Sequence, residues 1–312
     1  MTSFRYKDKA TSIHRLNPFC KLTWVGSILV LALILDHPFF LLVLFLSTLP
    51  VVIAANVVKE WGSFMRFAAY LCLAIVAINV LIDALVGHNG TTILAQAPFQ
   101  LPLVGTPAVT LEAAFFGIMM CLRLLSIISA FTLLTLTVNP DDMMLSMIKM
   151  KLPYKSVLVT SLSTRFFPTL VDDAERITDV QRSRGLELDK GGLTQRIRGR
   201  MSIITPLLSN SLDRTVQVAE AMESRGFGNG TKRTFYKDIQ FSRIDIVTLL
   251  TILSVCALGI AMTIQGYGDY QYYPTLGEIN LGVVEWIILP ILVVFLSSIV
   301  LLASLKRRTD LD

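Results

Sequence analysis

The tripeptide Ser-Arg-Gly occurs twice in this chain, as Ser183-Arg184-Gly185 and again as Ser224-Arg225-Gly226. Its arginine carries a planar guanidinium with five donors and a permanent charge, so it can bind carboxylates or carbonyl oxygens in two-point contacts. The small serine and glycine beside it allow another backbone to approach closely. These residues therefore predict docking to a partner protein rather than the making or breaking of bonds.

Each tripeptide also fits a simpler role as the end of a helix. Glycine adopts the left-handed conformation of a helix C-terminus at little cost, and a basic residue complements the helix dipole there. One such cap needs no further explanation. Two long amphipathic helices that end in the same three residues favour docking. Their apolar residues recur every three or four positions. The first stripe comprises Leu158, Leu162, Phe166, Leu170, Ala174, Ile177 and Val180, and the second comprises Leu208, Leu212, Val216, Ala219 and Met222.

The composition indicates a membrane protein. Charged residues make up 16% of the chain, against about 25% in soluble domains. No lysine or arginine occurs between Arg66 and Arg123 or between Arg243 and Lys306, and such gaps are typical of membrane-spanning helices. The first apolar segment would span only about 21 Å as a helix, less than the roughly 30 Å of a membrane's hydrocarbon core. The sequence therefore leaves open whether the hairpin that it forms with the second segment crosses the membrane fully. The apolar segments are 22–35, 39–58, 64–86, 111–138, 244–264 and 283–305.

The distribution of basic residues orients these segments, because cytoplasmic loops are enriched in lysine and arginine. The loops at 36–38, 87–110 and 265–282 contain neither residue, whereas both terminal tails are basic. We therefore expect both termini in the cytoplasm. The roles of the breaker-rich loop 87–110 and the tyrosine-rich loop 265–282 stay open.

The fold class expected is an all-α membrane protein with about six transmembrane or membrane-embedded helices and a cytoplasmic block of long amphipathic helices. Its predicted domains are an N-terminal membrane domain of four apolar helices (1–138), the cytoplasmic block (139–243), and the C-terminal membrane helices with a basic tail (244–312).

Arg123 lies near the middle of the fourth apolar segment. Insertion of an arginine there costs about 2.5–3.5 kcal/mol, so its side chain should face protein or water. On the residues alone, a structural or coupling role and a role in substrate or proton binding both stay open. Asp83, Glu112 and Asp245 lie near segment ends and are expected to reach the membrane interface.

Other chemistry finds little support in the sequence. The four cysteines contain no CxxC pair, and the three histidines are too dispersed for a metal site. No phosphate-binding loop, nucleophile elbow or HExxH motif occurs. The net charge of +5 reflects basic ends and loops rather than a nucleic-acid surface. The sequence thus predicts no enzyme activity, no metal and no cofactor bound by this chain.

An ordered series of motifs resembles the transmembrane T component of energy-coupling factor (ECF) transporters, the EcfT/CbiQ family. The resemblance covers most of the chain, with serine in both tripeptides where the family usually has alanine. The matching residues are Asn17-Pro18 with Lys21-Leu22, Arg123, Thr137 to Asp142, Leu152-Pro153, Arg165 with Pro168, and the two tripeptides.

This resemblance implies a non-catalytic coupling subunit of an ABC-type importer in the prokaryotic plasma membrane. Its implied partners are two cytosolic ATPases, as a homodimer or heterodimer, and a membrane-embedded substrate-binding S component. ATP and Mg are implied to bind the ATPases, and each tripeptide is implied to dock one ATPase subunit. The cargo would be a vitamin or a transition-metal ion, which the sequence cannot distinguish, nor can it tell a dedicated S component from a shared one. The alternative is a stand-alone secondary transporter or channel that uses Arg123.

Overall fold

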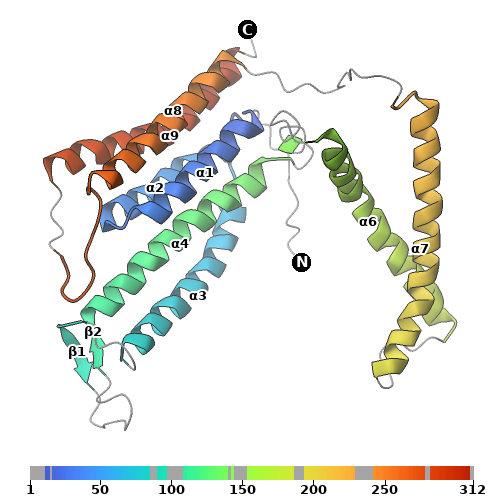
Figure 1. Ribbon diagram of the computed structural model, residues 1–312, viewed down its shortest axis with the longest axis horizontal. Helices are drawn as coiled ribbons and strands as arrows, with labels where there is room; N and C mark the ends of the chain where they lie inside the picture. Colours follow the sequence, from blue (N-terminus) through green and yellow to red (C-terminus); the bar gives the residue numbers. More distant parts are fainter. Residues whose placement is uncertain are drawn as a thin grey trace. The chain divides into compact units, whose positions relative to one another are not determined.

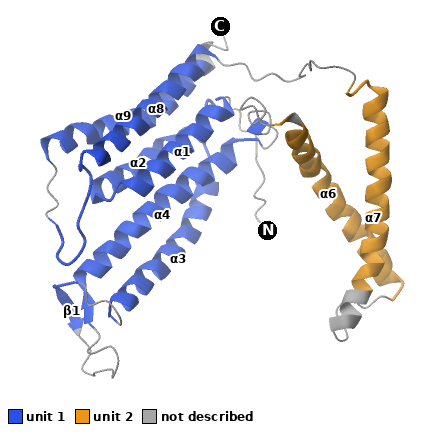
Figure 2. Ribbon diagram, in the orientation of Figure 1, with its two compact units in different colours: residues 1–143, 240–312 blue, residues 144–239 orange. Residues whose placement is uncertain are grey.

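The computed structural model describes residues 11–14, 16–84, 90–96, 108–139, 142–143, 153–185, 193–228, 242–277 and 282–309. The chain separates into two compact units (Figure 2). Unit 1 comprises residues 1–143 and 240–312, and unit 2 comprises residues 144–239. The three functional domains expected from the sequence stay a prediction, and each unit is described by itself below.

Unit 1 is a bundle of apolar helices (Figure 1). Five of the described helices are long and apolar enough to cross a membrane, and α1 is a shorter apolar helix. The expected all-α membrane fold is confirmed. The helices of the bundle are α1 (Pro18–Ile34), α2 (Pro38–Ala55), α3 (Val58–Ile82), α4 (Leu111–Thr137), α8 (Arg243–Ile264) and α9 (Val283–Thr309).

The largest boundary difference from the sequence prediction is the start of α3, at Val58 instead of residue 64. Asn56 ends α2 in the left-handed conformation with a φ of 55°. The chain then re-enters a helix at once, and Glu60 in the first turn complements the positive end of the helix dipole. Charged residues in that turn hid the start of the helix, because the apolar pattern alone marked its membrane part.

Helices α1 and α2 lie at the centre of the bundle. Helix α1 packs on α4 and α8, and α2 packs on α4 and α9. Over the most apolar 18 residues of each helix, 56% of α2 is buried inside the protein but only 11% of α3. Helix α3 contacts mainly α4. Helix α3 therefore turns most of its apolar surface away from the protein. Trp24, Ile28, Leu31, Phe40 and Leu44 are among the fully or almost fully buried residues of the core.

Helices α3 and α4 approach each other closely along their length. An added Cβ at Gly117 would lie 3.3 Å from the Cα atom of Val76. One turn away, the Cys121 thiol donates to the carbonyl oxygen of Cys72 at 3.3 Å. Small residues at such crossings allow helices to pack in a membrane, where no hydrophobic force drives them together.

The turn between α1 and α2 lies well short of the N-terminal end of α4. Arg123 of α4 contacts this turn at Asp36, and Arg123 lies about 18 Å along the helix from Leu111 at 1.5 Å per residue. The hairpin of α1 and α2 thus reaches only partway along α4. Whether this hairpin crosses the bilayer fully stays open.

The tyrosine-rich segment 265–277 packs on the turn between α1 and α2, beside the N-terminal part of α4 that the hairpin does not reach. The backbone amides of Asp36 and His37 donate to the carbonyl oxygen of Gly268 at 3.3 and 2.9 Å. Tyr272 donates to the carbonyl oxygen of Asp36 at 2.5 Å, and its ring meets Phe116 of α4 edge to face. Burial raises the pKa of Tyr272, so the hydroxyl stays a donor at neutral pH.

A small hairpin of strands β1 (Ile93–Gln96) and β2 (Ala108–Thr110) stands where α4 begins. The two strands are antiparallel, with Gln96 opposite Ala108. Segment 265–277 reaches this hairpin, since the amide of Thr91 donates to the carbonyl oxygen of Pro274 at 3.2 Å. Most of the breaker-rich loop at 87–110 lies outside the described residues.

Unit 2 contains two long helices, α6 (Tyr154–Ser183) and α7 (Leu193–Ser224). They have 30 and 32 residues and pack against each other (Figure 1). The short amphipathic helix expected between Asn139 and Pro153 lies almost wholly outside the described residues.

The close approach of α3 and α4 makes a prediction about Gly117. Replacing Gly117 with leucine should force these helices apart and lower the free energy of unfolding by about 1–3 kcal/mol, as overpacking usually does. Thermal denaturation of the detergent-purified chain measures the effect. Gly26→Leu is the matched control, because nothing lies within 4 Å of a Cβ at Gly26. Equal melting temperatures for the two variants would contradict the close contact.

Candidate functional site

The first tripeptide forms the C-terminus of α6. Ser183 is the last helical residue, Arg184 is the C-cap, and Gly185 follows with a φ of 85°. The amide of Gly185 donates to the carbonyl oxygen of Arg182 at 3.0 Å, and the Ser183 hydroxyl donates to that of Asp179 at 2.9 Å. Glycine is needed at residue 185 because side chains rarely tolerate the left-handed backbone.

The second tripeptide ends α7 with the same geometry. Gly226 has a φ of 76°, and its amide donates to the carbonyl oxygen of Glu223 at 2.8 Å. The amide of Phe227 donates to the carbonyl oxygen of Met222 at 3.0 Å, which completes a Schellman cap. Arg225 therefore occupies the same position in its cap as Arg184 does in the first. The simple helix-end role holds for both glycines.

Both arginines are exposed. Within the described part of the chain, no hydrogen bond or ion pair is formed by the guanidinium of Arg184 or Arg225. The capping bonds come from the backbone and from the serine hydroxyls. The cap thus fixes the backbone of each arginine, and its guanidinium is available to bind a partner.

The two arginines stand at opposite ends of an antiparallel helix pair. Arg214 of α7 forms an ion pair with Asp173 of α6 at 2.9 Å, and the Gln181 amide donates to the carbonyl oxygen of Ser202. Moving toward the end of α6 therefore means moving toward the start of α7. Arg184 and Arg225 lie beyond this ion pair in opposite directions, so the two caps are about 33 Å apart along the helix pair.

The ion pair between Asp173 and Arg214 joins the two helices at equivalent positions. Each of these residues precedes the arginine of its own tripeptide by eleven positions, Asp173 before Arg184 and Arg214 before Arg225. From the crossing, each helix runs on for about 16 Å to its arginine.

The apolar stripes of the two helices differ in how far they are buried. The predicted stripe of α6 is half-buried from Leu158 to Ile177, which fits its packing against α7, but its last member, Val180, is exposed. Helix α7 turns its own stripe outward, so it keeps an apolar face that the described residues of unit 2 leave uncovered. The exposed side chains of this face are Met201, Ile204, Leu208, Leu212 and Val216.

Arg123 belongs to unit 1 and contacts the turn between α1 and α2. Its guanidinium donates to the carboxylate of Asp36 at 2.5 Å and to the carbonyl oxygen of Leu35 at 3.1 Å. Leu35 is the C-cap of α1, so the arginine meets the negative end of that helix dipole. The sequence predicted an inward-facing arginine but gave no sign of which residues it meets.

The carboxylates of Asp83, Glu112 and Asp245 are buried in the protein, with 5%, 1% and 0% exposure. Thr110 donates to Asp83 at 2.5 Å, and Glu112 accepts from the backbone amide of Thr92 at 3.0 Å. Each carboxylate thus finds donors at a helix end, and its place at the membrane interface stays a prediction. For Asp245 the Ser-x-x-Asp spacing after Ser242 was an available signal of a capping box.

Comparisons with known proteins agree on one family. A family model described as cobalt transport protein, CbiQ, matches residues 9–236, which include Arg123 and both tripeptides. The energy-coupling factor transporter transmembrane protein EcfT of Bacillus selenitireducens is 30% identical over 271 residues, 84% of this chain and 97% of that protein. EcfT of Streptococcus thermophilus is 31% identical over 266 residues, 83% of this chain and 96% of that protein. EcfT of Bacillus subtilis is 28% identical over 262 residues, 81% and 95% of the two chains.

The crossing of α6 and α7 can be tested by exchanging its charges. Asp173→Arg places two arginines together and should destabilise the helix pair by roughly 1 kcal/mol or more. Combining it with Arg214→Asp restores opposite charges and should recover most of that loss. Hydrogen exchange of the α6 and α7 amides in the purified chain reports the change. Glu175→Arg, at an exposed position beside the crossing, is the control. A double variant no more protected than Asp173→Arg would contradict this pairing.

Arg123→Met removes the charge that holds Asp36 and the carbonyl group of Leu35. Loss of one partner from a buried ion pair costs about 3–5 kcal/mol. The Asp36 side chain is 47% exposed, so we expect a smaller loss of about 2 kcal/mol, seen as a lower melting temperature in detergent. Asp36→Asn should cost less, because the arginine keeps the Leu35 contact. An Arg123→Met variant of unchanged stability that loses transport by the chain alone would favour the secondary-transporter alternative.

Proposed function

The chain belongs to the CbiQ/EcfT family, and we propose that it is the coupling subunit of an ECF-type importer. In this role it joins two cytosolic ABC ATPase subunits to a membrane-embedded S component that binds the substrate. The chain is a multi-pass membrane protein, and its relatives are transporter components. The observation that carries the proposal is the pair of exposed arginines, each followed by a left-handed glycine that ends its helix, at opposite ends of the antiparallel helix pair.

Two equal docking points suit a partner with two equal subunits. An ATPase dimer has a two-fold axis, so it offers the same groove twice, at two places and in opposite directions. The ion pair between Asp173 and Arg214 places Arg184 and Arg225 at equal distances from one crossing, in opposite directions. Each arginine can then enter one groove and bind carboxylates or carbonyl oxygens there with its planar fork. Grooves in either a homodimer or a heterodimer meet this requirement.

Two long helices can also carry movement away from such grooves. When ATP and Mg bind between the ATPase subunits and draw them together, the two arginine-bearing ends move with them. A rigid helix transmits displacement along its length, and the ion pair at the crossing couples the two helices. The chain itself takes no part in ATP hydrolysis in this scheme, so it is not an enzyme and holds no cofactor of its own.

The uncovered face of α7 offers a place for the S component. It presents five apolar side chains that are each at least 50% exposed, Met201, Ile204, Leu208, Leu212 and Val216. A contiguous apolar face of this kind is typical of a surface that another protein or lipid covers. The cargo is a vitamin or a transition-metal ion, selected by the S component. Basic residues at both termini favour a cytoplasmic location for the chain ends in a prokaryotic plasma membrane.

Charge reversal at the two tips tests the docking role. Arg184→Glu or Arg225→Glu should each weaken ATPase retention about tenfold or more, since truncating an anchoring arginine typically costs about 2 kcal/mol. The double variant should retain no ATPase and support no uptake, while membrane insertion stays normal. Co-purification from cells that express the neighbouring genes, followed by uptake assays, measures both effects.

The control is Arg176→Glu, which reverses an exposed charge on α6 two turns before its tip. It should leave ATPase retention close to that of the unchanged chain. Full uptake by the double tip variant, or an equal loss in the control, would contradict docking through Arg184 and Arg225.

A further inference from the structure

The chain leaves unit 1 after α4 and returns to it just before α8, and buried groups hold both points. At the exit, the Lys21 ammonium donates to the carbonyl oxygen of Thr137 at 2.8 Å and to that of His14 at 3.1 Å. Thr137 is the last residue of α4, and Lys21 lies in the first turn of α1. The lysine therefore places a positive charge at the negative end of the α4 dipole.

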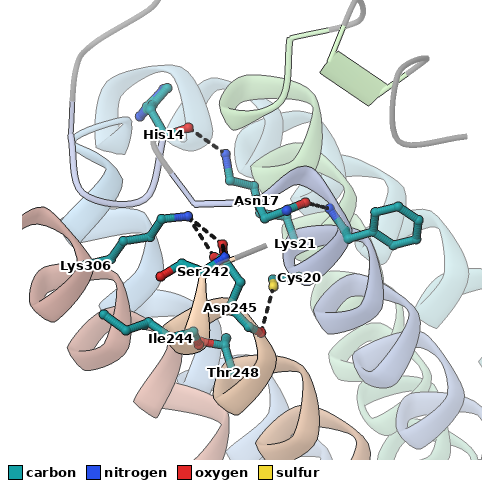
Figure 3. Close-up of polar contacts among 10 residues, drawn as sticks. His14, Asn17, Cys20, Lys21, Ser242, Ile244, Asp245, Thr248 and Lys306 are labelled. Atoms are coloured by element: carbon teal, nitrogen blue, oxygen red, sulfur yellow. Dashed lines mark hydrogen bonds and ion pairs between the residues drawn. The ribbon is translucent and has the colours of Figure 1, made fainter. Parts of the chain in front are cut away.

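At the return, Asp245 organises the first turn of α8 (Figure 3). Its carboxylate accepts from the backbone amide of Ser242 at 3.1 Å as part of a capping box. The Lys306 ammonium of α9 reaches the same carboxylate at 2.8 and 2.7 Å. Asp245 is fully buried and the Lys306 side chain is only 12% exposed, so water screens this pair little.

The exit and the return share one support, the first turn of α1. The thiol of Cys20 donates to the backbone carbonyl oxygen of Asp245 at 3.4 Å (Figure 3), and Cys20 precedes Lys21. Asn17 caps this turn by accepting from the amide of Phe19 at 3.0 Å. We name Asn17, Lys21, Ser242, Asp245 and Lys306 the junction cluster. It lies wholly within unit 1.

The burial of the two lysines distinguishes this cluster from ordinary interface residues. A lysine near the end of a membrane helix usually extends its ammonium into water and the headgroup region. Lys21 is instead 5% exposed and binds the carbonyl oxygens of Thr137, at the end of α4, and of His14, ahead of α1. Lys21 thus holds backbone at the exit, whereas Lys306 holds the return through the carboxylate of Asp245.

We propose that the junction cluster is the joint through which unit 2 acts on the membrane bundle, with Lys21 and Lys306 as its positioning residues. The proposal rests on the proposed coupling function. Force applied to a helix end is lost if that end unwinds. By holding the last turn of α4 and the first turn of α8, the lysines keep both ends helical under load, so displacement of unit 2 reaches the bundle.

The first test needs only the chain in detergent and measures amide hydrogen exchange. Lys306→Met keeps the length of the side chain and removes its charge, so amides 244–248 should exchange about tenfold faster or more. Lys21→Met should do the same for amides 134–138. Lys306→Arg should restore protection, and Lys59→Met, at an exposed lysine of α3, should change neither segment. Ser242→Ala, which removes one half of the capping box, is a milder variant should Lys306→Met fold poorly.

The second test uses the transporter reconstituted in vesicles with its ATPases and S component. For Lys306→Met and Lys21→Met, we expect ATPase retention and ATP hydrolysis to persist while import falls, so ATP hydrolysed per substrate imported rises severalfold. A merely stabilising role would lower assembly, hydrolysis and import together. Unchanged exchange rates, or an unchanged ratio despite faster exchange, would overturn the joint. An unaltered chain that retains no ATPase would instead contradict the proposed function, and the exchange measurement would still judge the cluster.

Discussion

The ends of the helices are the constraint on which this protein is built. A helix leaves four amide groups and four carbonyl groups unpaired at its ends, and an apolar medium offers them no water. In unit 1, side chains from other helices supply the missing partners. Arg123 of α4 meets the end of α1, and Lys21 of α1 meets the end of α4. At the start of α8, its own Asp245 caps the first turn and is held by Lys306 of α9. Charges that would be costly in a membrane are therefore the contacts that fix helix lengths and hold the bundle together.

Unit 2 meets the same constraint differently. Its helices α6 and α7 end in caps closed by the backbone itself, with glycine in the left-handed conformation. The side chains of the adjacent arginines are not needed for these caps and are exposed. The same residue type is therefore internal at Arg123 and external at Arg184 and Arg225. A paired arginine stabilises the fold, whereas an exposed one on a rigid helix tip is available to a partner.

The sequence was informative wherever a local pattern decided the structure. Charge-free stretches located the membrane helices, and glycine after arginine located both helix ends of unit 2. It was silent where the partner lies far along the chain. No sequence pattern near Arg123 indicates that it pairs with Asp36, and none near Asp245 indicates that it pairs with Lys306. The equal spacing of the two tips from one crossing also escaped prediction, because it requires knowing that Asp173 meets Arg214. The docking role of the tips stays a prediction that the matched caps and the family membership support.

The central claim is that each tip of unit 2 enters its own ATPase subunit, and photo-crosslinking tests it most directly. A photoreactive amino acid in place of Ser183 or Ser224 lies beside the docking arginine without removing it. In the assembled transporter, each singly labelled chain should capture one ATPase polypeptide, and the doubly labelled chain should capture two. Capture of no ATPase from either position, or of a single subunit by both labels, would contradict the claim.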